Sequence, residues 1–155
     1  MLDDATRRTR FRSLPPRERR LATQGAILWS TTRLALRVVG FKRCSAALQW
    51  LTPRKDQIAA EWAAEDEATR VERAQRLLEL LIDWKPGTDD CLPRSLLLRW
   101  LLRQQGVESE LRIGARKVHG EMQAHAWIEY QGRPLNEDDN VHDRYAAFDQ
   151  HPEAW

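Results

Sequence analysis

The segment from Cys91 to Gly106, CLPRSLLLRWLLRQQG, constrains the fold of this chain more than any other. Its leucines and its tryptophan cover almost the whole circumference of a helix, so this helix has to lie buried in the middle of the molecule. Pro93 suits the first helical turn, where its missing N–H is not needed, and Gly106 is a typical helix end. Other elements must therefore pack around this helix on several sides.

The chain before Cys91 has the apolar periodicity of helices. Three helices are predicted there, over residues 17–39, 42–51 and 56–81. Gly40 is a suitable end for the first of them, and Asp56 is expected to cap the start of the third. The first twenty residues are rich in arginine and are broken by Pro15 and Pro16, so we predict a loose arm there.

After Gly106 the apolar period changes to two, which is typical of strands. Strands are predicted over residues 107–116, 121–130 and 134–136, with a turn at Gln131 and Gly132. The last twenty residues receive no assignment. The predicted fold class is α+β: a basic helical subdomain over 1–84, then a catalytic core over 85–155 with the Cys-bearing central helix and a small antiparallel sheet.

Charge is distributed unevenly along the chain. Residues 1–55 contain 13 Lys/Arg and 3 Asp/Glu, a net +10, whereas residues 56–155 contain 12 and 20, a net −8. The basic part has no interleaved aromatic residues of the kind that bind nucleic acid, so we expect it to dock a peptide or protein partner. Its most apolar stretch is interrupted by Arg33 and Arg37, which argues against a membrane span, and packing explains its amphipathic pattern better than membrane-surface binding.

The cysteines point to a reducing compartment. Cys44 and Cys91 are too few for a disulfide framework, and neither belongs to a CxxC pair. No apolar secretory signal is visible at the N-terminus. We therefore expect a cytoplasmic protein.

Cys91 and His125 together suggest thiol chemistry. A thiol at a helix start, beside an imidazole on a neighbouring strand, is stabilised as the nucleophilic thiolate. A single cysteine in an apolar helix is more often an inert core residue, and this pair alone does not exclude that. The strand adds an objection: if Ala126 and Ile128 pack on the central helix, His125 faces the other way. The objection disappears if both faces of a twisted sheet are covered.

A third polar residue usually orients such a histidine. The run Asn136-Glu137-Asp138-Asp139 follows the predicted hairpin and could supply it. Spacing alone does not choose among these four residues.

Two segments carry a family resemblance. CLPRSLLLRWLLRQQGVESELRIGARK and AHAWIEYQGRPLNE resemble the lasso-peptide leader peptidases, the B proteins of bacterial lasso-peptide biosynthesis, which are transglutaminase-like thiol proteases. The similarity is close over about residues 85–140, where CLxRS, ELRIG and AHAW follow in order. The helical N-terminal part is similar only in length and character.

The resemblance implies a catalytic triad and a papain-like core. Cys91 would be the nucleophile and His125 the general base and acid. The family's third member is an aspartate twelve residues after the histidine, and this chain has Glu137 there, with Asn136 and Asp138 as alternatives.

Two further residues are candidates for substrate binding. Arg94, on the central helix, is one of them, although it is equally suited to an ion pair with Asp89 or Asp90. Trp127 is the other.

The resemblance also implies a substrate and partners. The substrate would be a ribosomally made lasso precursor, cut between leader and core. A separate leader-recognition protein and an ATP-dependent cyclase would be partners, and no cofactor or metal is expected. A chain of this length leaves no visible room for the recognition domain itself. Two alternatives stay open: an amidase or acyltransferase on the same fold, and a non-catalytic peptide-binding module.

Overall fold

The computed structural model describes residues 4–38, 40, 43, 62, 64–82 and 90–148. The elements are helices α1 (Asp4–Ser13), α2 (Pro16–Val38), α5 (Glu67–Leu81), α6 (Cys91–Arg103) and α7 (Val141–Arg144), and strands β1 (Glu110–Val118), β2 (Glu121–Tyr130), β3 (Arg133–Pro134) and β4 (Ala146–Ala147). The predicted helix over 42–51 lies outside the described residues, apart from Arg43.

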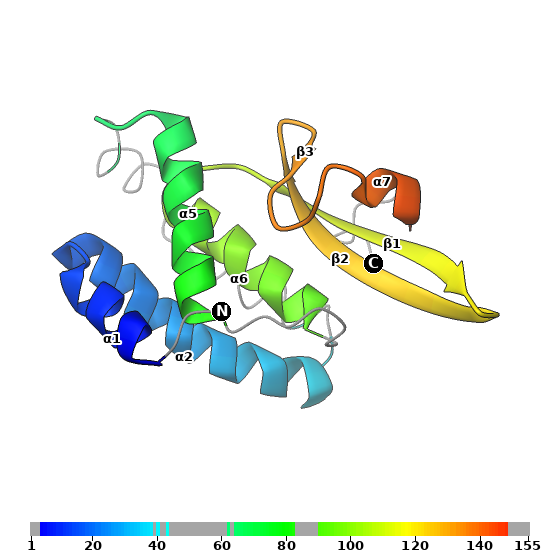
Figure 1. The fold of residues 1–155 in the computed structure, drawn as a ribbon, viewed down its shortest axis with the longest axis horizontal. Helices are drawn as coiled ribbons and strands as arrows, with labels where there is room; N and C mark the ends of the chain where they lie inside the picture. Colours follow the sequence, from blue (N-terminus) through cyan, green and yellow to red (C-terminus); the bar gives the residue numbers. More distant parts are fainter. Residues whose placement is uncertain are drawn as a thin grey trace.

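Helix α6 lies at the centre, as its composition predicts. It contacts α2, α5 and β2, and Leu98, Leu101 and Leu102 have no exposed surface. Figure 1 shows α1, α2 and α5 on one side of α6 and the sheet on the other. One hydrophobic cluster runs from α2 through α5 and α6 to β1 and β2. The α+β architecture is therefore confirmed.

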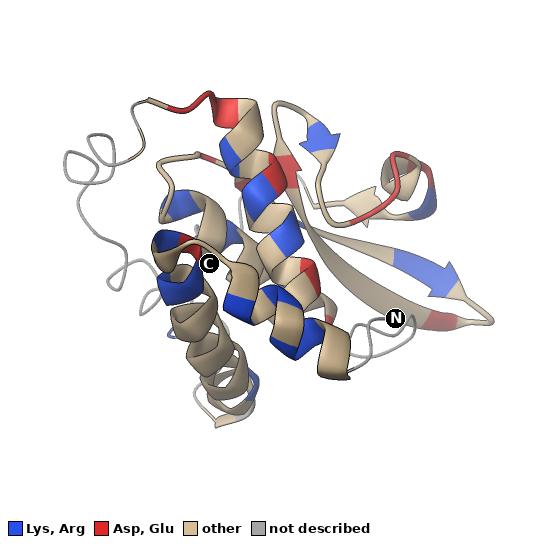
Figure 2. Cartoon of the chain, turned by 60° about the vertical axis from the view of Figure 1, so that its left-hand side comes forward, with Lys and Arg blue, Asp and Glu red and all other residues tan. Residues whose placement is uncertain are grey.

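The N-terminal region differs from the prediction of a loose arm. Residues 4–13 form α1, which ends before Pro15, and Phe11 and Leu14 pack against the main core. Burial of these two apolar residues anchors the segment, and the many arginines around them conceal this in the sequence. Figure 2 shows those basic residues along α1.

The start of α5 also corrects a prediction. A turn at residues 64–66 precedes the helix, which begins at Glu67 with Asp66 as its N-cap. The N–H of Thr69 donates to Asp66 Oδ2 at 3.1 Å. The cap is therefore Asp66, while Asp56 lies outside the described residues. None of the helices in the described ranges is long and apolar enough to cross a membrane.

The sheet has the order β3-β2-β1-β4, with every neighbouring pair antiparallel. A two-residue turn joins β1 to β2, and both of its residues, His119 and Gly120, have positive φ, as tight hairpins require. Strand β2 occupies the predicted residues. Strand β1 begins three residues later than predicted, at Glu110, and β3 is shorter than predicted.

Both faces of β2 are covered in its second half, from His125 onward. Ala126 and Ile128 belong to the main core beneath α6, whereas Trp127 packs on the opposite face against Val141 and Tyr145. The second face is covered by Val141 of α7 and by Tyr145, which precedes the edge strand β4. Neither α7 nor β4 has a counterpart in the sequence-based assignment. His125 therefore lies on a covered face of the sheet, opposite the apolar set.

Candidate active site

Cys91 is the first residue of α6 and carries a free, partly buried thiol. The preceding residue, Asp90, makes no side-chain capping hydrogen bond. Asp90 therefore does not cap the first N–H groups of α6, at the end where the helix dipole favours negative charge. This setting stabilises a thiolate or another anion.

His125 lies near this thiol because the start of α6 packs against the edge of β2 that faces away from β1. In the antiparallel pairing that starts at the hairpin, Ala126 and Ile128 point their N–H and C=O groups away from β1. Strand β3 covers that edge only at Glu129 and Tyr130, so the start of α6 occupies it at Ala126. Since α6 meets the edge of the strand, its first residue can be reached from the face that carries His125.

The sulfur of Cys91 has three hydrogen-bonding neighbours. These are the imidazole of His125 and the backbone N–H groups of Ala126 and Leu92. The ring atom Nε2 of His125 lies 3.0 Å from Glu137 Oε1, which leaves Nδ1 for the thiol. The Nε2–H bond is not aligned with the Glu137 oxygen, so this contact is a close charge pair rather than a linear hydrogen bond.

Glu137 is held by cations on several sides. Arg94 Nη1 lies 3.6 Å from its Oε1, and Arg144 Nη2 lies 3.6 Å from its Oε2. Burial raises the pKa of the Glu137 carboxyl, but His125 and the two arginines outweigh it and the pKa is lowered overall. Glu137 is therefore ionised beside the histidine at neutral pH.

The thiol and the imidazole shift each other's pKa. Burial raises the pKa of Cys91, but the hydrogen bond and charge of His125 and the two backbone N–H groups outweigh burial, so the pKa falls below 9.0. Hydrogen bonding to Cys91, and then contact with Glu137, raise the pKa of His125 from 6.5 to about 9 against the effect of burial. Both shifts favour the charged forms, the thiolate of Cys91 and the imidazolium of His125.

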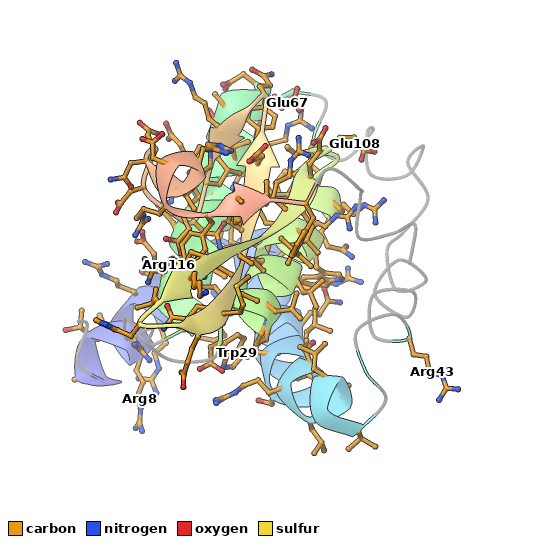
Figure 3. The ribbon with its side chains drawn as sticks, turned by 90° about the vertical axis from the view of Figure 1, so that its right-hand side faces the viewer. Arg8, Trp29, Arg43, Glu67, Glu108 and Arg116 are labelled. Carbon is orange, nitrogen blue, oxygen red and sulfur yellow. The ribbon has the colours of Figure 1, made fainter. Side chains whose placement is uncertain are left out.

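Aromatic rings pack against the imidazole of His125. Its ring stacks on Tyr145 with centroids 4.8 Å apart, and the guanidinium of Arg116, labelled in Figure 3, lies 4.6 Å from the centre of the Tyr145 ring. Trp127 lies further along the same face, and its Nε1 donates to Glu129 Oε1 at 2.7 Å. Packing on this face restricts the orientation of the imidazole.

The acidic residues before Cys91 oppose a thiolate only if their charge is not compensated. Arg33 Nε lies 3.1 Å from Asp90 Oδ1, and the Arg33 guanidinium also lies over the ring of Trp29. Asp90 is therefore paired across to α2, which weakens its repulsion of the thiolate. Asp89 lies outside the described residues.

The structure thus brings Cys91, His125 and Glu137 together. Asn136 lies beside them but bonds to the backbone of β2 and to Ser95. Asp138 is exposed, and its Oδ2 lies 3.9 Å from Arg144 Nη2.

The two candidate substrate-binding residues have other neighbours. Arg94 pairs with Glu137, and Trp127 has no exposed surface with which a substrate could make contact.

Sequence reasoning missed Tyr145, Arg144 and the network around Ser95. All three depend on contacts between segments that are far apart in the sequence. Of these residues, only Ser95 lies in a motif that the sequence singled out, CLPRS. Across the part of the chain that the structure describes, no cluster of three or more His, Cys, Asp or Glu side chains is placed to hold a metal ion.

Comparison with known proteins agrees with this geometry. The transglutaminase-like superfamily matches residues 33–149, from within α2 to just beyond β4. Searches of curated proteins and of solved structures give no significant match. Because the match covers most of the chain, including the helix with Cys91 and the strand with His125, this protein belongs to the transglutaminase-like superfamily.

Proposed function

We propose that this protein is a cysteine peptidase that removes the leader from a ribosomally made lasso-peptide precursor, with Cys91, His125 and Glu137 as its triad. The observation that carries the proposal is the cluster itself: a thiol at an uncapped helix start, hydrogen-bonded to an imidazole whose far nitrogen lies 3.0 Å from a carboxylate. This arrangement suits nucleophilic acyl transfer.

The first half of the reaction forms an acyl-enzyme. The Cys91 thiolate attacks the scissile carbonyl carbon, and N–H groups at the start of α6 stabilise the negative charge on the oxygen. The His125 imidazolium then gives its proton to the departing amine as the C–N bond breaks. The leader is left as a thioester on Cys91, and the core leaves with a free amino terminus.

The second half releases the leader. Neutral His125 takes a proton from water while the water oxygen attacks the thioester carbon. The C–S bond breaks, the leader leaves as a carboxylic acid, and the thiolate–imidazolium pair is restored. Glu137 holds the imidazole ring and stabilises its positive charge throughout, as the third member of such a triad does.

The choice of substrate is supported by the sequence segments CLPRS, ELRIG and AHAW, which resemble lasso leader peptidases. The same resemblance supports a separate leader-recognition protein and an ATP-dependent cyclase as partners. Arg94 remains a proposed contact for the leader, and its position beside Glu137 is the observation that supports this. Water as the acceptor distinguishes this peptidase from an acyltransferase with the same triad.

Alkylation offers a direct test of the proposal. The protein and its Cys44→Ala variant are each treated with iodoacetamide or left untreated, then incubated with a lasso precursor and its recognition protein. Mass spectrometry of untreated samples should show leader and core whose masses add up to the precursor plus one water. Alkylation should block cleavage in both proteins, because Cys91 remains in both.

Two results would contradict this proposal. One is an intact precursor in the untreated samples when an established leader peptidase cuts it in the same mixture. The other is cleavage that survives complete alkylation of Cys91. A product carrying an added primary amine in place of water would identify an acyltransferase instead.

The pH dependence of cleavage should distinguish the role of the His125 imidazolium from that of the Cys91 thiolate. The raised pKa of His125 means that the imidazolium is present at neutral pH and is lost as pH rises through about 9. Cleavage should therefore fall above about pH 9, because the leaving amine loses its proton donor. Alkylation of Cys91 needs only the thiolate, so its rate should not fall there. Cleavage that keeps rising above pH 9 would remove His125 as the acid.

A further inference from the structure

A continuous buried hydrogen-bond chain joins α6, β2 and the segment after β3. Asn136 Nδ2 donates to Ser95 Oγ at 3.1 Å, and Ser95 Oγ donates to the carbonyl oxygen of Ala126 at 2.9 Å. Asn136 Oδ1 accepts from the N–H of Ile128 at 2.8 Å. Ser95 has no exposed surface and Asn136 only 7%. We call Ser95 and Asn136, with these bonds, the Ser–Asn clamp.

Each part of the Ser–Asn clamp lies beside one residue of the triad. Ser95 is one helical turn after Cys91 on α6, Ala126 directly follows His125 on β2, and Asn136 directly precedes Glu137. The three triad residues come from separate segments. The clamp is the set of bonds that connects all three of these segments.

The backbone of Ala126 links the clamp to the sulfur. In a strand, the N–H and C=O of one residue point to the same side. The Ala126 C=O is fixed by Ser95, and its N–H donates to the sulfur of Cys91. A change in the Ser95 bond therefore moves a donor that contacts the thiol.

The donor and the acceptor at each step of this hydrogen-bond chain follow from the chemistry of the groups. The amide of Asn136 accepts from Ile128 through its oxygen and donates to Ser95 through its nitrogen, which leaves the Ser95 hydroxyl proton for Ala126. A carboxylate there would attract that proton and leave the Ala126 carbonyl without a partner. The segment is also held from α5, where Gln75 Nε2 donates to the Leu135 carbonyl at 2.7 Å.

We propose that Ser95 and Asn136 are positioning residues, which hold the Cys91 helix, the His125 strand and the Glu137 segment in the register that the thiolate–imidazolium pair requires. Their effect on catalysis rests on the proposed peptidase function, whereas their effect on the thiol does not. Neither residue has to touch the substrate.

The test measures the rate of Cys91 alkylation against pH in the full chain, where mass spectrometry separates Cys91 from Cys44. Ser95→Ala and Asn136→Asp are compared with the parent and with Gln105→Met. Gln105 is a matched control, because it is equally buried and hydrogen-bonded but belongs to the opposite end of α6, where it binds Arg73. Thermal unfolding of each variant is measured in parallel.

We expect the alkylation midpoint of both clamp variants to move upward by about one pH unit, so that alkylation at neutral pH is about tenfold slower. Gln105→Met should lose stability but keep the parent midpoint. A parent-like midpoint in folded Ser95→Ala and Asn136→Asp would overturn the proposal. If Ser95→Ala does not fold, Asn136→Leu decides in its place, because it removes the amide bonds, keeps about the size of the side chain and adds no charge beside the thiol.

Leader cleavage by the same proteins keeps the two proposals distinguishable. A parent with a depressed alkylation midpoint but no cleavage would contradict the peptidase function and leave the clamp supported. Cleavage by the parent, with unchanged cleavage and alkylation in both clamp variants, would contradict the clamp alone.

Discussion

Alanine at position 91 is expected to lower kcat/KM for leader cleavage by at least about 10³-fold. The variant loses the sulfur that is hydrogen-bonded to His125. His125→Ala should lose activity by a similar factor, because the thiol then has no imidazolium partner and the leaving amine no proton donor. The double variant should be no worse than either single one, because the two groups act as a unit.

The measurement is the initial rate of precursor cleavage, followed by mass spectrometry with the recognition protein present. Cys44→Ala is the matched control and should keep the parent rate, and circular dichroism should show that each variant is folded. Activity of His125→Ala within about tenfold of the parent would exclude the histidine from the chemistry. Losses that multiply in the double variant would show that the two residues act separately.

Trp127→Ala should cause the largest loss of stability among single changes near the site, about 3–5 kcal/mol of the free energy of unfolding. The ring is fully buried against Val141 and Tyr145 and donates to Glu129, so the change leaves a cavity and removes a donor from a buried carboxylate. Trp127→Phe keeps most of the packing and should lose less. Urea unfolding measures both.

Trp127 also distinguishes packing from substrate binding. A variant that keeps the parent stability but raises KM for the precursor would place this side chain in contact with substrate. Loss of stability in Trp127→Ala, with near-parent KM in folded Trp127→Phe, would assign it to the support of His125. The full burial of the ring favours the second result.

The elements with a strong pattern could be predicted from the sequence. Helix α6 is apolar all round, and β2 alternates cleanly between two turn signals, so both appear close to their predicted bounds. The pairing of Cys91 with His125 does not follow from these two elements alone, because the alternation of β2 places His125 opposite the apolar face. It follows from the family resemblance. Helix α7 and strand β4 could not be found, because elements of four and two residues depend on tertiary contacts rather than on their own sequence. Val141 of α7 packs on Trp127, and β4 pairs with β1.

The partners of the charged residues were the least predictable part of the site. The sequence offers Asp89 and Asp90 as nearby ion-pair partners for Arg94, whereas the structure places Arg94 beside Glu137, far along the chain. Asp90 pairs instead with Arg33 on α2. Composition shows which charges are available, and only the packing of α2, α6 and the segment after β3 decides which of them meet.

The position of Cys91 at the edge of β2 also has a consequence during biosynthesis. Before α6 docks on that strand, neither His125 nor the N–H of Ala126 is near the sulfur, and the chain carries an ordinary, largely protonated cysteine. A nascent or misfolded molecule therefore lacks the groups that lower the pKa of this thiol. Activation of Cys91 arrives together with tertiary structure.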